Sequence, residues 1–190
     1  MNFKLELPTY FLKPAELCFV REPSLIRTVL GSCVTVTMLC RRLGAAAACH
    51  PVLPVCREAS SCRPGSCRQK NKYVECVVPE MIRRFQELGV RLDELEVKLF
   101  GGANMFSRNG KQREILHVGN MNVSMARQKI AELELELKSF DVGGIQGRKL
   151  YFETGSGEVW VKKFQAESAS TDDKNIVQAQ LALQLKDYER

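Results

Sequence analysis

The chain has 190 residues, of which 45% are hydrophobic and 26% are charged; this composition is typical of a globular domain, with or without appendages, and not of a disordered chain. Its longest stretches without a charged residue, 28–40 and 43–56, are shorter than the roughly 20 residues of a transmembrane helix. Lys4, Glu6 and Pro8 stand where a signal peptide would have its apolar segment, so we expect a cytoplasmic protein without direct membrane insertion.

The net charge of +6 is concentrated in one stretch of the chain. Residues 41–72 hold seven basic residues and one acidic residue, Glu58, so the rest of the chain is neutral. A basic loop can attract nucleic acid, an anionic membrane or an acidic partner. No aromatic residue lies among these charges, so a solvated loop is the simpler interpretation and we expect no nucleic-acid partner.

Six of the eight cysteines lie between residues 33 and 67. No Cys-x-x-Cys pair, the usual start of a structural zinc site, occurs among them, so we expect reduced thiols and neither a metal nor another cofactor. Cys49 directly precedes His50, so on a strand its thiol would point to the face opposite the imidazole.

Hydrophobic patterning predicts the first elements. The apolar, β-branched segment 25–39 predicts a strand that Gly31 and Ser32 interrupt, which marks a bulge or a close approach to the backbone. A second strand within 43–54 ends at a pair of prolines. The polar, turn-rich loop 55–71 that follows looks like an insertion.

The second half of the chain alternates between helical and extended patterns. The predicted elements are a helix at 72–88, strands at 96–100 and 114–118, a helix at 122–137, a hairpin of 148–153 and 158–164, and a weakly amphipathic helix at 176–188. Because strands and helices do not alternate strictly, we expect an α+β fold with mixed β-sheets forming a sandwich-like core flanked by helices. We assign residues 1–164, with the loop 55–71, to a single domain and 165–190 to a C-terminal tail.

Cys33 and His50 are the candidate catalytic residues. Cys33 follows Gly31 and Ser32 at the strand interruption, where unpaired backbone N–H groups could hold the oxyanion of a hydrolysis intermediate. His50 lies on the next apolar segment, and a hairpin-like return would bring it against Cys33, the pair that a cysteine hydrolase needs. Inert core residues are the alternative for both. His117 is interpreted as a strand-surface or core residue.

A series of motifs resembles the chemoreceptor glutamine deamidase family, CheD. They are LGSCVTV (30–36), a histidine 17 residues after the cysteine, VLP (52–54), KY (72–73), KLFGGANMF (98–106), VGNMNV (118–123), DVGGIQGRKLYF (141–152) and GEVWVKKF (157–164). The resemblance covers about residues 20–164 and leaves out the Cys-rich loop and the tail.

The resemblance implies hydrolysis of glutamine side chains on the cytoplasmic domains of chemotaxis receptors, giving glutamate and ammonia. It implies Cys33 as the nucleophile that forms a thioester and His50 as the general base and then acid. A CheC-type response-regulator phosphatase is the partner that it implies. Two alternatives remain: a protein that mainly binds such a phosphatase, and a zinc- or nucleic-acid-binding module built on the loop 55–71.

The third catalytic residue that the resemblance implies is a threonine shortly before the cysteine, and Thr28 is the candidate. On a regular strand the five-residue spacing would place Thr28 and Cys33 on opposite faces, and a bulge at 31–32 would correct this. A backbone carbonyl could orient His50 instead.

Gly101, Gly102 and Asn122 fall in the remaining motifs. They either form structural turns or line the substrate groove together with Gly31 and Ser32, and turns are the simpler interpretation for glycine pairs at strand ends.

The basic loop directly follows segment 50–54, so we expect it at the mouth of the active site. There its charge would attract an acidic receptor surface, and a loop without function is the alternative.

Overall fold

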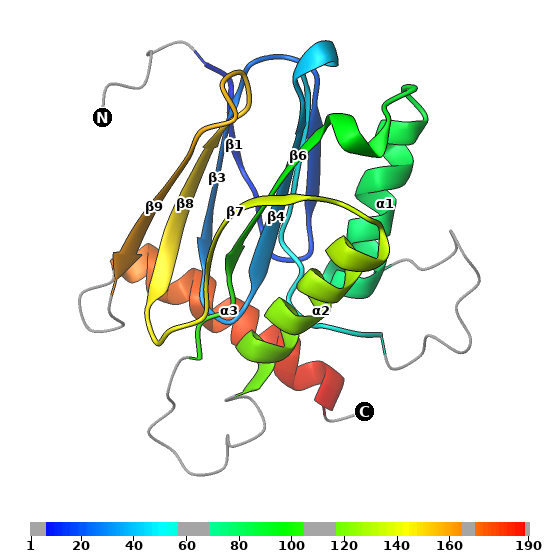
Figure 1. Cartoon of the computed structure of the whole chain (residues 1–190). Helices are drawn as coiled ribbons and strands as arrows, with labels where there is room; N and C mark the ends of the chain where they lie inside the picture. The colour runs from blue at the N-terminus through cyan, green and yellow to red at the C-terminus, as the bar shows by residue number, and fades with distance from the viewer. Residues whose placement is uncertain (1–6, 57–68, 105–116, 165–169, 189–190) are drawn as a thin grey trace.

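Two mixed β-sheets and three α-helices make up the computed structural model, which describes residues 7–56, 69–104, 117–164 and 170–188 (Figure 1). The first sheet has the order β1 (Thr9–Phe11), β3 (Leu25–Leu30), β8 (Gly147–Glu153), β9 (Val159–Phe164). The second has the order β2 (Leu17–Val20), β5 (Ala45–Cys49), β4 (Val34–Cys40), β6 (Leu95–Gly101), β7 (Leu137–Val142). The helices are α1 (Val74–Gln86), α2 (Val118–Glu132) and α3 (Thr171–Tyr188). The predicted α+β class is confirmed.

Apolar side chains fill two separate layers. One lies between the sheets and includes Ile26 and Leu150 from the first sheet and Ala48 and Phe100 from the second. The other lies between the second sheet and the helices α1 and α2, which cover that sheet's outer face (Figure 1). The second sheet is therefore buried on both faces, which explains why every residue of β4 and β5 is buried rather than every second one.

The interruption at Gly31 and Ser32 is where the chain passes from one sheet to the other. β3 ends at Leu30 in the first sheet, and β4 begins at Val34 in the second. The predicted break is confirmed, but it is a crossing between sheets and not a bulge within one strand.

The region after residue 113 differs from its prediction in two places. The helix predicted at 122–137 runs from Val118 to Glu132, so Val118 does not end a strand, and residues 114–116 of that predicted strand lie outside the described residues. Leu137 opens β7, which pairs in parallel with β6. The helix prediction failed there because a long-range strand pairing overrode the local periodicity.

The C-terminal helix α3 begins at Thr171, five residues before its predicted start. Ser170 forms its capping box: the Ser170 hydroxyl accepts a hydrogen bond from the Asp173 N–H at 3.3 Å, and its own N–H donates to the Asp173 carboxylate at 3.3 Å. The helix crosses the end of the sheets at which β3 leads into β4 (Figure 1). No helix in the described ranges is long and apolar enough to cross a membrane.

Candidate active site

Cys33 lies in the crossing between β3 and β4 and is fully buried. Its carbonyl accepts a hydrogen bond from the Gly102 N–H at 2.7 Å. Gly101 has a φ of +106°, and a Cβ on it would lie 2.3 Å from the Cys33 carbonyl oxygen. A Cβ on Gly102 would lie 2.3 Å from the side chain of Val123. The two glycines therefore pack behind the backbone of Cys33, as a close approach of two chain segments requires.

His50 follows β5 directly, and the N-terminal segment fixes its backbone. The His50 N–H donates to the Glu16 carbonyl at 2.9 Å, and its carbonyl accepts from the Ala15 N–H at 2.8 Å. The imidazole is fully buried.

Thr28, on β3, is hydrogen-bonded to the imidazole. The Thr28 hydroxyl donates to the Leu12 carbonyl at 2.7 Å and lies 2.8 Å from His50 Nδ1. Because its single proton is directed to Leu12, the hydroxyl must accept from an Nδ1–H, and this tautomer leaves the lone pair of His50 on Nε2. The candidate triad thus combines Thr28 from the first sheet, His50 from the end of a strand of the second sheet, and Cys33 from the crossing between them. Because Thr28 and Cys33 are not on one continuous strand, their five-residue spacing does not place them on opposite faces.

Burial keeps the two reactive groups neutral. It raises the pKa of the Cys33 thiol well above its usual range, and it lowers the pKa of His50 to about 4 against a weaker opposing effect of the Leu12 carbonyl. Within the described part of the chain, no hydrogen bond joins the thiol to His50. This arrangement is a resting thiol and imidazole, not a thiolate–imidazolium pair.

Asn122, on α2, joins the segments that carry the two candidate residues. Its side-chain amide donates to the Ser32 carbonyl at 3.0 Å and to the Val52 carbonyl at 3.1 Å. Asn122 is fully buried, so it holds the Cys33 crossing against the chain after His50 and does not line an open groove.

Two glutamines of α3, to which the sequence analysis gave no role, complete the site. The Gln180 side-chain oxygen accepts from the Gly31 N–H at 3.1 Å, and its nitrogen lies 2.6 Å from the Val29 carbonyl and 3.2 Å from His50 Nε2. Gln184 is hydrogen-bonded to the Ser32 hydroxyl at 2.9 Å and donates to the Val52 carbonyl at 2.8 Å. Their spacing of four residues, which places both on one helix face, was the available signal.

Cys49 points away from the site, as predicted. It lies in the apolar layer beneath the helices, its thiol is 3.7 Å from the Val36 carbonyl, and burial raises its pKa to about 12. His117 is exposed at the start of α2, so its interpretation as a strand or core residue was wrong.

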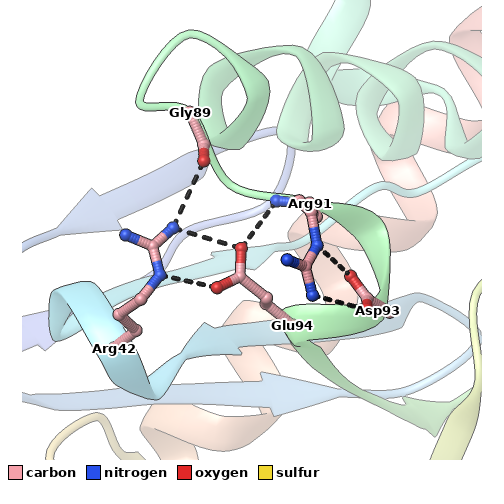
Figure 2. Close-up of polar contacts among 5 residues, drawn as sticks. All are labelled: Arg42, Gly89, Arg91, Asp93 and Glu94. Atoms are coloured by element: carbon pink, nitrogen blue, oxygen red, sulfur yellow. Dashed lines mark hydrogen bonds and ion pairs between the residues drawn. The ribbon is translucent and has the colours of Figure 1, made fainter.

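The basic stretch 41–72 is not one loop. Arg41 and Arg42 lie in the 3₁₀ turn η1 (Arg41–Leu43), at the far end of β4 from Cys33. Arg42 pairs with Glu94 and donates to the Gly89 carbonyl (Figure 2), and Arg41 pairs with Glu96. The Cys-rich segment 57–68, on which the zinc or nucleic-acid alternative rests, lies outside the described residues. The described ranges contain no group of three or more metal-ligating side chains.

Comparisons with known proteins match this chain to one family. The model of the family described as CheD chemotactic sensory transduction matches residues 57–163. "Probable chemoreceptor glutamine deamidase CheD 2" of Geobacter sulfurreducens is 38% identical over 166 residues, which cover 87% of this chain and 96% of the relative. A probable chemoreceptor glutamine deamidase CheD of Oleidesulfovibrio alaskensis is 42% identical and covers 82% of this chain and 73% of the relative. One from Methanococcus maripaludis is 33% identical and covers 80% and 92%.

The family model matches residues 57–163, and the matches to the relatives cover more of the chain. A match that spans 87% of the chain includes positions 33 and 50 wherever it begins. The motifs, the α+β fold and these comparisons agree: the chain belongs to the CheD family.

Proposed function

We propose that this protein is a protein-glutamine glutaminase that hydrolyses side-chain amides of chemotaxis receptors to glutamate and ammonia. The observation that carries the proposal is the Thr28–His50 hydrogen bond of 2.8 Å, at a histidine that Gln180 also links to the Gly31 N–H, two residues before Cys33. The relatives named chemoreceptor glutamine deamidase support the substrate class.

In the proposed reaction, His50 first activates Cys33. Thr28 holds the Nδ1–H, so the lone pair of His50 lies on Nε2, the atom that takes the thiol proton when the Cys33 side chain turns toward it. Burial disfavours the separated thiolate and imidazolium, and their mutual attraction on formation of the pair offsets part of that penalty.

The thiolate then attacks the amide carbon, and the Gly31 N–H is the described donor best placed for the oxyanion. The C–N bond breaks as His50 gives its proton to the leaving ammonia, which leaves a thioester on Cys33. His50 next deprotonates a water molecule that attacks the thioester, and Cys33 recovers its proton as glutamate is released.

The setting of the proposed reaction follows from its substrate. Receptor signalling domains are helical bundles in the cytoplasm, so we place the protein there, with the glutamine presented from a helix. We also propose residues 1–164 as the catalytic domain, and a CheC-type phosphatase as a partner on the family resemblance.

The test is mass spectrometry of a receptor cytoplasmic fragment after incubation with the full chain. Conversion of specific glutamines to glutamates by the wild type, and not by a Cys33→Ala variant, is the expected result. An unmodified fragment that nevertheless co-purifies with the protein would favour the binding role and overturn the proposal. Metal analysis of chain purified without chelator tests the zinc alternative separately, since bound zinc would support a module on the loop 55–71.

A further inference from the structure

The helix α3 buries polar side chains where a core helix would bury apolar ones. Among residues 171–184 the buried positions are Asp173, Gln180 and Gln184. The apolar Ile176 and Leu183 are only half-buried. A helix docked permanently onto the core normally presents its apolar stripe to it. The buried face of α3 instead carries polar side chains, and two of them, Gln180 and Gln184, form hydrogen bonds with the backbone of the candidate active site.

The Gln180 side chain makes the contacts that a substrate amide would need. Its oxygen accepts from the Gly31 N–H at 3.1 Å, where an oxyanion would form. Its nitrogen lies 3.2 Å from His50 Nε2, the atom that must protonate the leaving ammonia. The Val29 carbonyl, 2.6 Å from the same nitrogen, fixes which end of the amide faces the histidine.

We propose that Gln180 occupies the subsite for the substrate glutamine, so that α3 is a built-in ligand with which a receptor helix must compete. This inference rests on the proposed function and adds to it the amide subsite, formed by Gly31, Val29 and His50. It also adds a resting state in which the protein's own C-terminal helix stands where the receptor helix binds.

The occupied subsite is also an inactive one. The Gln180 nitrogen donates to the Nε2 lone pair that would otherwise accept the Cys33 proton, so the thiol stays neutral while α3 is docked. Cys33 and His50 have no exposed surface in this arrangement, and Leu183 packs against the apolar layer that contains Cys33. A receptor side chain reaches the thiol only after α3 has left.

The Val29 carbonyl gives the subsite a preference for amide over acid. A glutamine offers it an N–H, whereas the glutamate product would place a carboxylate oxygen against a carbonyl oxygen, and two acceptors repel each other. The subsite should therefore bind the substrate glutamine more tightly than the product glutamate.

Two features of the described residues outside the site bear on how α3 docks. Lys149 on β8 pairs with Asp173 at 2.8 Å. Beside the first turns a hollow of about 200 Å³, lined partly by Phe11, Arg27 and Ile176, separates the helix from the sheet. Among the described residues, docking thus depends on Gln180, Gln184, the Lys149–Asp173 ion pair and the partial burial of apolar side chains such as Leu183, which a competing helix can displace.

The experiment compares full-length variants by alkylation of Cys33 with iodoacetamide, followed by peptide mapping. Gln180→Ala leaves the Gly31 N–H and the Val29 carbonyl without their partner, so we expect Cys33 to be alkylated about tenfold faster or more. Gln178→Ala is the matched control, because Gln178 is exposed on the same helix and should leave the rate unchanged. Cys49, equally buried in the other apolar layer, reports unfolding, since only a globally opened chain exposes it.

A second variant loosens α3 without touching the site. Lys149→Glu places a carboxylate against Asp173, so it should also accelerate Cys33 alkylation while Cys49 stays protected. On a receptor fragment, both variants should lower KM, because less of the enzyme is occupied by its own helix. Gln180→Glu should behave like Gln180→Ala at neutral pH, since it loses the N–H that the Val29 carbonyl accepts.

The outcomes separate the inference from the proposed function. Alkylation that is equally slow in wild type, Gln180→Ala and Lys149→Glu, with all three folded, overturns the inference whatever the enzyme does. Acceleration by Lys149→Glu but not by Gln180→Ala overturns the assignment of Gln180 to the substrate subsite. Failure of every variant to deamidate a receptor overturns the proposed function, and the alkylation rates still report whether α3 covers Cys33.

Discussion

The two ends of β4 differ in charge and in exposure to water. At its start, Cys33, His50 and Thr28 are buried, Thr28 is hydrogen-bonded to His50, and none of the three carries a charge. At its end, Arg41 and Arg42 form ion pairs with acidic partners, and their side chains keep 60% and 52% of their surface in water. Seven residues of one strand separate a neutral, dry centre from a charged, wet one.

The difference shows what burial contributes to each end. Loss of water lowers the pKa of His50 to about 4, so the buried end disfavours charge until substrate chemistry requires it. At the wet end the Arg42 guanidinium lowers the pKa of Glu94 to about 2, so the charged forms are the stable ones. One strand, β4, therefore has a buried reactive site at its start and an exposed Arg42–Glu94 ion pair at its end.

Removal of the nucleophile should have the largest effect. Cys33→Ala should reduce deamidation of a receptor fragment at least about 10³-fold, because no thioester can form. The melting temperature should change little, since one buried sulfur atom is lost from a packed layer. Cys49→Ala, an equally buried thiol outside the site, is the control and should retain activity. Normal turnover by Cys33→Ala would remove the catalytic assignment.

Thr28 should come next, as a positioning residue. Thr28→Val keeps the shape but removes the side-chain acceptor of the His50 Nδ1–H and the hydroxyl that donates to the Leu12 carbonyl, which leaves that carbonyl as the remaining acceptor, 3.3 Å from Nδ1. We expect kcat to fall by about 10- to 100-fold, by analogy with the loss of a hydrogen-bond partner that orients a metal-ligating imidazole. The free energy of unfolding should fall by about 1–3 kcal/mol. Thr28→Ser keeps the hydroxyl and should recover most of both; equal kcat for Val and wild type would indicate that a backbone carbonyl orients His50.

Acid should lower the free energy of unfolding through protonation of His50, at the buried end of β4. The folded-state pKa of His50, about 4, lies below its ordinary value of 6.5, so between these values the unfolded chain binds more protons. Stability is therefore complete above pH 6.5 and falls as the pH drops toward 4, by up to about 1.4 kcal/mol per pH unit. The described partners of the ring are Thr28, the Leu12 carbonyl and Gln180, none of which carries a charge. Denaturation at pH 7 and pH 5 should show a flatter pH dependence for His50→Gln than for wild type, with the exposed His117→Gln as control.

Local patterns predicted much of this architecture. The break at Gly31, the β8–β9 hairpin and the C-terminal helix all follow from turn residues and short-range periodicity. β7 was missed because LKSFDV has Phe140 largely exposed and gains its strand conformation from parallel pairing with β6, which lies far away in sequence.

The site was half predictable for the same reason. Cys33 and His50 could be proposed from residue chemistry and the family motifs. The Thr28 spacing made sense only once the chain was seen to change sheets between Leu30 and Val34. Gln180 could not be found by motif, because its role depends on where a helix 130 residues from His50 in sequence docks.

The basic residues of the segment 57–68 should have a smaller effect than Thr28. Residues 57–68 lie outside the described part of the chain; the described range before them ends at Cys56, four residues after Val52, whose carbonyl accepts hydrogen bonds from Asn122 and Gln184 at the site. Replacement of Arg57, Arg63 and Arg68 by Ser should lower kcat/KM on a receptor a few-fold at low salt and leave kcat unchanged, through weaker long-range attraction.

The salt dependence decides whether this loop steers the receptor. Attraction over about 8 Å is screened at physiological ionic strength, so the difference between wild type and the triple Ser variant should shrink as salt is added. The matched triple Lys variant keeps the charge and should follow wild type. Identical salt profiles for all three would indicate a loop without function. Lys70 is left in place because it pairs with Glu80 at 3.0 Å.

The smallest effect should come from the charged end of β4. Arg42→Ala removes both hydrogen bonds to Glu94 and one to the Gly89 carbonyl (Figure 2), but exposed ion pairs add little because water solvates the separated charges well. The melting temperature should drop by no more than a few degrees, and deamidation should not change.

The contribution of this ion pair should depend on pH. The pKa of Glu94 is lowered from 4.5 to about 2, so the pair stabilises the protein above pH 4.5 and loses this effect as the pH falls toward about 2. The difference in melting temperature between wild type and Arg42→Ala should therefore shrink at acidic pH, with Arg42→Lys, which keeps charge without the two-pronged contact, in between. A large loss of activity in Arg42→Ala would show that the two ends of β4 are coupled, contrary to the separation described above.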